Sequence, residues 1–381
     1  MDIIDKLRVL SADSQYDLAC ACGTEASRKR TRGLDGKWLY PVSLPQGGYT
    51  ILLKTLLTNA CSNDCKYCPL RAGSDVRRIS LAPEEVASAF IEYYRRRKAF
   101  GLFLSSAVVK DPDYTMDRIN SVARILREKH GFRGYMHLKV IPGASDGAIE
   151  DSLSLATAVS LNIETPARRS FEALTQTKDY ERDIMRPLGL IGRLTGQGMR
   201  HSGVKCTTQF IVGASDEKDS EIVESIFSLY KRMNIRRAYF SSYQRGLGAP
   251  DIPGERRPLS APDELFVREH RLYQTEFLIR KYGFERDDII FDKEGNLKLD
   301  KDPKEAWADS HPEFFPMRLG TADREALLRV PGLGPETVRR ILMVRRQGGL
   351  GSLSGGTPSV LDAVGLKGKR LERVRRYAVM G

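Results

Sequence analysis

The chain has 381 residues, a length that suits two or three domains of about 150 residues each. Hydrophobic residues make up 41% and charged residues 29%, an ordinary globular composition that excludes wholesale disorder and collagen-like structure. The 61 basic residues exceed the 49 acidic ones by 12, and most of that excess lies near the C-terminus.

Residues 1–48 show no clear periodic pattern, and we expect them to form an extension that wraps around the following domain. They contain no basic stretch followed by an apolar run, so no secretory signal is expected. No run of 18 apolar residues occurs in the sequence, so no transmembrane helix is expected either. We therefore expect a cytoplasmic protein without a membrane partner, whose thiols stay reduced.

From residue 49 to residue 245, short apolar runs alternate with stretches of helical pattern. This alternation predicts an α/β fold with a parallel sheet covered by helices, and six such units fit a partial (βα)6 barrel. The predicted strands are Ile51–Thr58, Leu102–Ser106, Tyr135–Val140, Val159–Glu164, Lys205–Val212 and Arg237–Ser242. The predicted helices are Pro83–Phe100, Met116–Lys129, Ala148–Ala156, Tyr180–Leu194 and Ser220–Met233.

The third and fourth predicted strands each have one apolar and one polar face. Because helices cover the outside of such a barrel, the polar faces should point inward and line a binding cavity. In barrels of this kind the chemistry takes place at the C-terminal ends of the strands. The side chains expected inside are Tyr135, His137, Lys139, Ser160, Asn162 and Glu164.

Three of the six cysteines, Cys61, Cys65 and Cys68, form a C-x3-C-x2-C run directly after the first predicted strand. Closely spaced thiols in a cytoplasmic chain indicate a metal site more than a disulfide framework. Zinc would need a fourth ligand, and no further cysteine or histidine lies nearby in the sequence. Three thiolates can hold three corners of a [4Fe–4S] cube and leave one iron open to a small molecule.

With Tyr67 in its aromatic position, this run resembles the signature of the radical S-adenosylmethionine superfamily, C-x3-C-x-aromatic-C after the first strand of a partial βα barrel. The resemblance covers roughly residues 49 to 242. It implies a [4Fe–4S] cluster whose open iron chelates the amino and carboxylate groups of S-adenosylmethionine. Reductive cleavage then yields methionine and a 5′-deoxyadenosyl radical, with an electron donor such as flavodoxin or ferredoxin.

The resemblance also implies which residues contact S-adenosylmethionine. The family often has Gly-Gly-Glu after the second strand, where it holds the methionine amino group, but this chain has Ser105 and Ser106. Lys139 suits the methionine carboxylate, and the polar side chains of the fourth strand suit the ribose hydroxyls. The alternative for each residue is a structural hydrogen bond or ion pair. The expected contacts are Tyr67, Ser105, Ser106, Lys139, Ser160, Asn162 and Glu164.

Three cysteines lie outside the motif, namely Cys20, Cys22 and Cys206. Cys206 shares the apolar face of its strand and is expected to be a small buried hydrophobic residue. For Cys20 and Cys22 we expect structural thiols, with a redox or hydrogen-donating thiol and an auxiliary cluster as the alternatives.

Residues 246–316 are expected to connect the barrel to a separate C-terminal module. A loop rich in glycine and proline comes first, followed by a long predicted helix, Pro262–Tyr282. The stretch Asp300–Pro316 contains three prolines and is expected to be a linker.

Residues 317–381 carry 13 basic and 5 acidic side chains, a balance of +8 that indicates contact with a polyanion. Gly332 and Gly334 flank one apolar residue between two helical runs, and Arg339 and Arg340 follow. The backbone can turn tightly at these glycines and present N–H groups at a helix N-terminus, which favours an anion.

This segment resembles the helix-hairpin-helix motif, which holds the nucleic-acid backbone without reading its sequence, and a second copy follows after about thirty residues. The resemblance implies a small all-α domain whose phosphate contacts are non-specific and salt-sensitive. The alternative is a basic helical domain that binds protein or nothing. The expected contacts are Gly332, Gly334, Arg339, Arg340, Gly365, Gly368, Lys369 and Arg370.

The combination of barrel and tail, with Leu104–Ser106 and His137–Gly143 in place, resembles a radical S-adenosylmethionine family assigned to DNA modification or repair. Spore photoproduct lyase is a more distant resemblance, because its hydrogen-donating cysteine is replaced here by serine. The implied function is S-adenosylmethionine cleavage directed at DNA. Two alternatives stay open, an enzyme of the same superfamily that modifies RNA or tRNA, and a DNA-binding protein with a structural or redox-sensing cluster.

Overall fold

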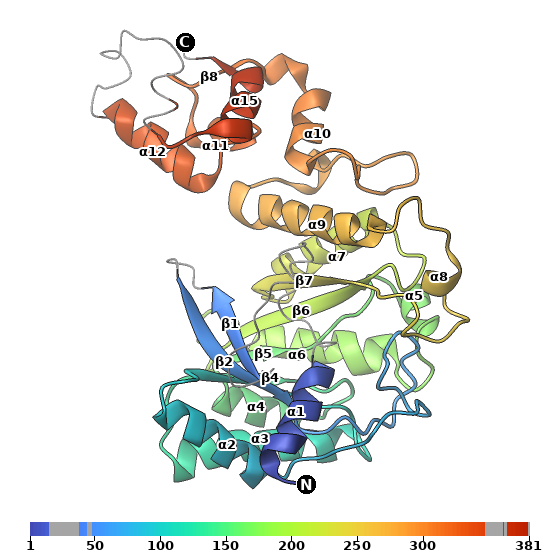
Figure 1. Cartoon of the computed structure of the whole chain (residues 1–381). Helices are drawn as coiled ribbons and strands as arrows, with labels where there is room; N and C mark the ends of the chain where they lie inside the picture. The colour runs from blue at the N-terminus through green and yellow to red at the C-terminus, as the bar shows by residue number, and fades with distance from the viewer. Residues whose placement is uncertain (15–37, 44–47, 347–360, 362–363, 380–381) are drawn as a thin grey trace. The chain divides into compact units, whose positions relative to one another are not determined.

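The computed structural model contains the whole chain, and the structure describes residues 1–14, 38–43, 48–346, 361 and 364–379 (Figure 1). The chain divides into two compact units, which are described separately below. The first comprises Met1–Glu217 and Glu224–Glu269, and the second comprises Lys218–Val223 and His270–Gly381. In the described part of the chain, every helix is too short or too polar to cross a lipid bilayer.

The first unit is built on a curled seven-stranded sheet whose strands lie side by side in chain order (Figure 1). β1 is antiparallel to β2, whereas β2 to β7 are all parallel. These six parallel strands confirm the predicted α/β arrangement. The strands are β1 (Leu39–Ser43), β2 (Tyr49–Leu56), β3 (Gly101–Ser105), β4 (Tyr135–Lys139), β5 (Ala158–Ser160), β6 (Lys205–Val212) and β7 (Arg237–Ser242).

Helices connect the parallel strands, as the alternating pattern predicts. α2 begins with Pro83 at its first position and glutamates in its first turn, which suit the positive end of the helix dipole. α3 and α6 each adjoin a π-helical turn, and the short α5 was not predicted. The helices are α2 (Pro83–Arg95), α3 (Pro112–Arg124), α4 (Asp146–Leu155), α5 (Arg168–Glu172), α6 (Arg186–Leu194) and α7 (Asp219–Arg232).

The predicted strand boundaries differ from the structure most at β5. That strand ends at Ser160 instead of Glu164, and Glu164, with a φ of 65°, makes only an isolated β-bridge to Phe210. The N-terminal extension supplies α1 (Ile3–Asp13) and the edge strand β1. Residues 15–37, which include Cys20 and Cys22, lie outside the described residues, so the expectation that the extension wraps the barrel stays a prediction.

The two faces of the sheet have the polarity predicted from the sequence. On β6, Cys206 and Phe210 are fully buried on the outer face, and the Phe210 ring stacks on Phe240 of β7 at 5.8 Å. The Cys206 thiol is free, which confirms a small buried residue. On the inner face the strands carry buried polar residues, among them His137 and Lys139 of β4. The interior of the barrel is therefore polar.

The second unit is mainly helical. Its elements include α10 (Pro303–Ser310), α11 (Arg324–Arg329), α12 (Pro335–Arg346) and α15 (Gly368–Tyr377), and α9 (Glu264–Phe277) belongs to it from His270 onward. The prediction of an all-α module is wrong in one detail, since β8 (Met317–Arg318) pairs in parallel with β9 (Ala378–Val379).

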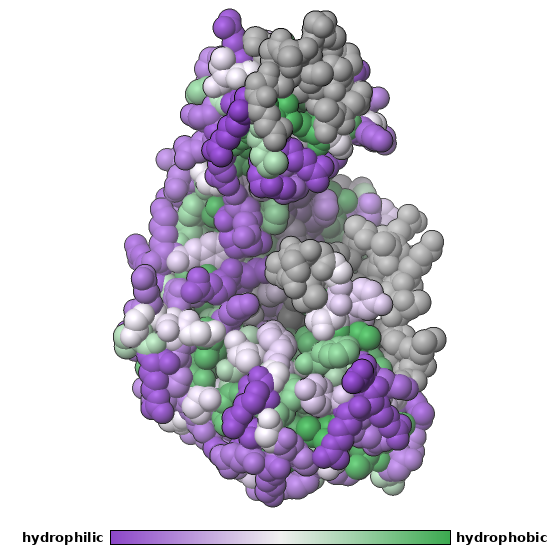
Figure 2. All heavy atoms as spheres, turned by 90° about the vertical axis from the view of Figure 1, so that its left-hand side faces the viewer, coloured by the Kyte–Doolittle hydropathy of each residue, from purple (hydrophilic) through white to green (hydrophobic). Residues whose placement is uncertain are grey.

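Figure 2 shows that hydrophilic side chains cover most of one face of the molecule, with apolar patches among them.

The predicted linker Asp300–Pro316 is instead part of the packed structure of the second unit. It contains α10, whose Trp307 is buried and packs edge-on against Phe284 at a ring distance of 5.8 Å. Pro303 does not break this helix, because it occupies the first turn, where no backbone N–H is needed.

Candidate functional site

The C-x3-C-x2-C segment lies in the loop between β2 and α2, at the C-terminal end of the barrel strands. Asn59, which is fully buried, begins this loop and accepts a hydrogen bond of 2.6 Å from the Ile79 N–H. The Arg78 guanidinium donates to the carbonyl oxygens of Asn59 and Leu70 at 2.6 and 2.8 Å. Backbone on both sides of the three cysteines is thus fixed to the same arginine.

A second set of hydrogen bonds joins the middle of the cysteine loop to the segment after α5. The Asp64 carboxylate accepts from the hydroxyls of Thr175 and Thr177, at 2.5 and 2.8 Å, and from the Gln176 N–H at 2.9 Å. Partial burial opposes the charged form, but these hydrogen bonds outweigh it and lower the pKa of Asp64 to about 2. The loop is therefore held by an ionised carboxylate at neutral pH.

A cavity of about 150 Å³ lies beside the loop, and the three cysteines are part of its wall. The ends of the neighbouring strands supply the rest, so chain segments far apart in sequence meet there. The motif residues and predicted cofactor contacts that line it are Cys61, Cys65, Tyr67, Cys68, Ser105, Ser106, Lys139, Asn162 and Glu164. Ser160 is the one predicted contact that does not line this cavity.

Two polar pairs are formed by these residues. The Lys139 ammonium donates a 2.6 Å hydrogen bond to the Asn162 side-chain oxygen. Burial, together with a hydrogen bond to the Glu164 carboxylate, raises the pKa of Tyr67 well above its ordinary value. Glu164 holds its left-handed backbone through hydrogen bonds to both sides of Phe210 on β6. Strained backbone of this kind is concentrated at functional sites.

The three thiols of the motif are suited to a multi-iron cluster. Among the described residues, no group of three His, Cys, Asp or Glu side chains converges on one metal ion. The cysteines of the motif are free thiols that face one cavity, as ligands to separate irons of one cube would. Burial raises the pKa of Cys68 to about 12, so this thiol is protonated until a metal binds. The residues present therefore fit a [4Fe–4S] cluster.

The sequence did not identify Lys178, which lines the same cavity. Burial alone would lower the pKa of this ammonium, but its interactions with the Cys65 sulfur and the Glu164 carboxylate raise it above its ordinary value. This lysine belongs to no recognisable sequence motif. It lies in the irregular segment after α5, and only the folding of the chain brings its side chain to the cavity. It adds a positive charge next to the thiols.

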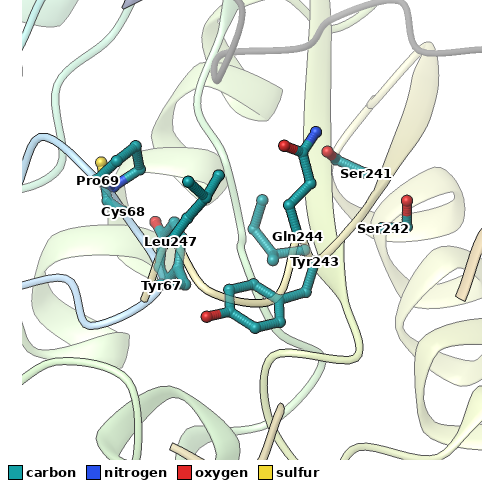
Figure 3. A pocket seen from close by; sticks show the side chains of 9 residues that line it. Tyr67, Cys68, Pro69, Ser241, Ser242, Tyr243, Gln244 and Leu247 are labelled. Carbon is teal, nitrogen blue, oxygen red and sulfur yellow. The ribbon is translucent and has the colours of Figure 1, made fainter. Parts of the chain in front are cut away.

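A smaller cavity of about 50 Å³ adjoins the same loop (Figure 3). It shares Tyr67, Cys68 and Ile211 with the larger one. Its other side is formed by residues 241–244 and Leu247, which lie at and just after the end of β7. This part of the wall is tied to the cysteine loop, since Arg71 donates a 3.0 Å hydrogen bond to the Leu247 carbonyl.

In the second unit, α11 and α12 are joined by the tight turn Val330–Gly334. Gly332 has a φ of 90°, and a Cβ there would lie 2.8 Å from Val374 of α15. Lys304 also holds the turn, because its side-chain nitrogen donates a 2.6 Å hydrogen bond to the Leu333 carbonyl. The segment of the first predicted hairpin therefore contains two helices joined by a tight turn. Of the second predicted hairpin, residues 364–370 lie within the described part of the chain, whereas residues 347–360 and 362–363 before it do not.

The predicted nucleic-acid contacts do not all have free side chains. Arg370 donates to the Gly332 carbonyl and to the Thr337 hydroxyl, at 3.1 and 3.3 Å, so it holds the turn together. Arg339 and Arg340 both pair with Glu336, although their side chains are 61% and 50% exposed. Lys369 is also exposed, and Gly365 and Gly368 have positive φ values of 83° and 55° next to it.

Comparison with known proteins gives similar solved structures only. No protein-family model matches the chain, and no curated protein does. The FeFe-hydrogenase maturase HydG from Carboxydothermus hydrogenoformans is 13% identical, over 85% of this chain and 81% of that one, with a TM-score of 0.46. Methylornithine synthase (PylB) is 13% identical over 71% and 74%, with a TM-score of 0.44. SuiB from Streptococcus suis is 12% identical over 61% and 48%, also with a TM-score of 0.44.

Proposed function

We propose that the chain is a radical S-adenosylmethionine enzyme that acts on DNA. The first half of this proposal, the radical S-adenosylmethionine chemistry, is supported by the cavity at the strand ends. Three free cysteine thiols line this cavity together with the buried Lys139 and Glu164. A [4Fe–4S] cluster bound there would supply the electron for the reductive cleavage of S-adenosylmethionine to methionine and a 5′-deoxyadenosyl radical.

The roles of this chain's residues follow from their chemistry. Cys61, Cys65 and Cys68 would hold the cluster and leave its fourth iron to S-adenosylmethionine. Lys139, an ammonium fixed by Asn162, suits the methionine carboxylate, and it is 7% exposed, so water screens it little. Glu164 and Asn162 suit the ribose hydroxyls, and the hydroxyls of Ser105 and Ser106 suit the methionine amino group.

The first test is anaerobic reconstitution with iron and sulfide, followed by reduction with dithionite in the presence of S-adenosylmethionine. Wild type should bind about four irons per chain and release 5′-deoxyadenosine. Single changes of Cys61, Cys65 or Cys68 to Ala should abolish both the iron content and the cluster absorbance. Cys206→Ala is the matched control and should keep four irons, because this thiol is buried on the outer face of β6.

The DNA half of the proposal is supported by the helix–turn–helix of the second unit and its exposed basic side chains. The tight turn at Gly332 precedes α12, and the side chains of Arg339, Lys367 and Lys369 are exposed near the two glycine turns. Such groups neutralise phosphates without reading the bases, so binding should be largely independent of sequence and steeply dependent on salt.

The second test measures duplex DNA binding at several salt concentrations in the full chain. The triple variant Arg339→Gln, Lys367→Gln and Lys369→Gln should bind more weakly and show a shallower dependence of log K on log salt, by about 0.9 for each phosphate that the variant no longer neutralises. Lys293→Gln with Lys298→Gln changes two exposed lysines elsewhere in the same unit and serves as the control. Equal affinity and equal slope in the triple variant would remove the support for DNA.

A further inference from the structure

Three buried polar side chains inside the barrel have no hydrogen-bond partner among the described residues. They are Ser160 of β5 and Thr207 and Gln209 of β6. Their exposed fractions are 3%, 9% and 2%. In Gln209 both amide atoms, the oxygen and the nitrogen, lack a partner. Ser160 and Thr207 are paired in the register of the two strands, so the three form one polar layer.

This layer faces the barrel interior below the cavity that contains the cysteines. Gln209 and Thr207 lie on the same face of β6 as Ile211, which lines that cavity, because side chains of a strand alternate between its faces. Ser160 lies two residues before Asn162, which also lines it. Ser160 is also the register partner of Lys139, and the Glu164 N–H donates to the Gln209 carbonyl, so the layer adjoins the residues assigned to S-adenosylmethionine.

A buried amide without partners destabilises a folded chain, because its hydrogen bonds to water are lost and not replaced. An aliphatic residue of similar size would fit a barrel wall better at this position. The binding mode proposed above for S-adenosylmethionine gives no role to Gln209, Thr207 or Ser160. The layer is thus suited to a second ligand that carries both hydrogen-bond donors and acceptors.

Aromatic rings beside the layer indicate the shape of that ligand. Tyr239 of β7 is the register partner of Gln209, and the Arg237 guanidinium lies over its ring at 4.7 Å. On the other side of the interior, the rings of Phe103 and His137 are 4.4 Å apart. Flat rings next to an amide suit a planar heteroaromatic group whose edge has a donor beside an acceptor, and nucleobases have such an edge.

We propose that Ser160, Thr207 and Gln209 bind the edge of one nucleobase of the substrate, turned out of its strand into the barrel. This proposal rests on the proposed action on DNA. Enzymes that act on a base inside a duplex must extrude it, and they recognise it by hydrogen bonds to its edge and by stacking on aromatic side chains. The Gln209 amide would make the paired donor and acceptor contacts, and the two hydroxyls would complete them.

The test measures binding of the four 2′-deoxynucleosides to the reconstituted full-length protein by equilibrium dialysis and saturation-transfer NMR. Wild type should bind at least one of them, and Gln209→Leu, which keeps the volume and removes both polar atoms, should weaken that binding about tenfold to a hundredfold. The melting temperature of the ligand-free variant should be equal to or above that of wild type, since a buried unpartnered amide is removed. Gln197→Leu, at an exposed glutamine of the same unit, should change nucleoside binding little.

Three outcomes would overturn the proposal while 5′-deoxyadenosine is still formed. They are unchanged nucleoside affinity in Gln209→Leu, binding of free L-amino acids in place of nucleosides by wild type, and weakened S-adenosylmethionine affinity in Gln209→Leu, which would assign the layer to the cofactor. Failure of the proposed function is a different result, because then wild type itself would form no 5′-deoxyadenosine or bind no duplex.

Discussion

The Asp64 carboxylate and the Thr177 hydroxyl are joined by a hydrogen bond of 2.8 Å, although they are separated by 113 residues in the chain. This bond connects the cysteine loop after β2 to the segment after α5, and Lys178 follows Thr177 directly. The same contact therefore fixes the thiols and brings a cation to the cavity they line.

Replacement of Asp64 should loosen the cysteine loop. Asp64→Ala removes the acceptor for the hydroxyls of Thr175 and Thr177, and hydrogen bonds to a charged group contribute about 1.5–3 kcal/mol. We expect the reconstituted variant to lose iron faster to a chelator such as bathophenanthroline. Asp151→Ala is the control, because it removes an ion pair with Arg124 that lies outside the cysteine loop. Equal rates of iron loss in wild type and Asp64→Ala would show that this contact does not hold the loop.

Loss of Lys139 or of the Glu164 carboxylate should weaken cofactor binding without loss of the cluster. Lys139→Met and Glu164→Gln keep the size of each side chain, and removal of one charge-assisted hydrogen bond corresponds to roughly tenfold to a hundredfold in affinity. The measurement is the dissociation constant of S-adenosylmethionine by equilibrium dialysis, with iron content determined in parallel. Glu150→Gln, at an exposed side chain of α4, is the control. Unchanged affinity in both variants would assign these residues to structural roles.

The turn between α11 and α12 should not accept a side chain at Gly332. Gly332→Ala would place a Cβ 2.8 Å from Val374 and would also hold alanine at a φ of 90°, with a cost of about 1–3 kcal/mol. The second unit should melt at a lower temperature, and duplex binding should weaken with it. Gly147→Ala in α4 is the matched change, because nothing lies within 4 Å of a Cβ there and alanine favours a helix. A melting temperature for Gly332→Ala equal to that of wild type would contradict this account of the turn.

Lys304 should make the stability of the second unit depend on pH. Burial lowers the pKa of this ammonium well below its ordinary value, so between that lowered pKa and about 10.5 the unfolded chain binds more protons than the folded one. Stability should therefore rise with pH in this window, and the destabilisation should be complete below the lowered pKa. Thermal melts of wild type and Lys304→Met from pH 7 to pH 10 should show a stability difference that changes with pH. A difference that is constant with pH would mean that Lys304 keeps its ordinary pKa.

The strands were predictable from the sequence where local pattern and tertiary structure agree. β6 and β7 have the predicted limits, Lys205–Val212 and Arg237–Ser242, because apolar residues under the helices alternate with polar residues of the interior. β5 was too long in the prediction. Its polarity continues to Glu164, but the left-handed backbone at that residue is imposed by the hydrogen bonds on both sides of Phe210 in the next strand.

The sequence by itself determined the cysteine motif, the inward polar faces and the basic glycine turns, since each depends on spacing of a few residues. Only the tertiary structure decided the rest. β1 joins the sheet through pairing with β2, and α10 forms in a segment with the prolines of a linker, because Trp307 is buried against partners distant in sequence. Lys178 reaches the thiols, and Gln209 has no hydrogen-bond partner among the described residues, for the same physical reason. The surroundings of a side chain in a folded protein come mostly from residues that are distant from it in the sequence.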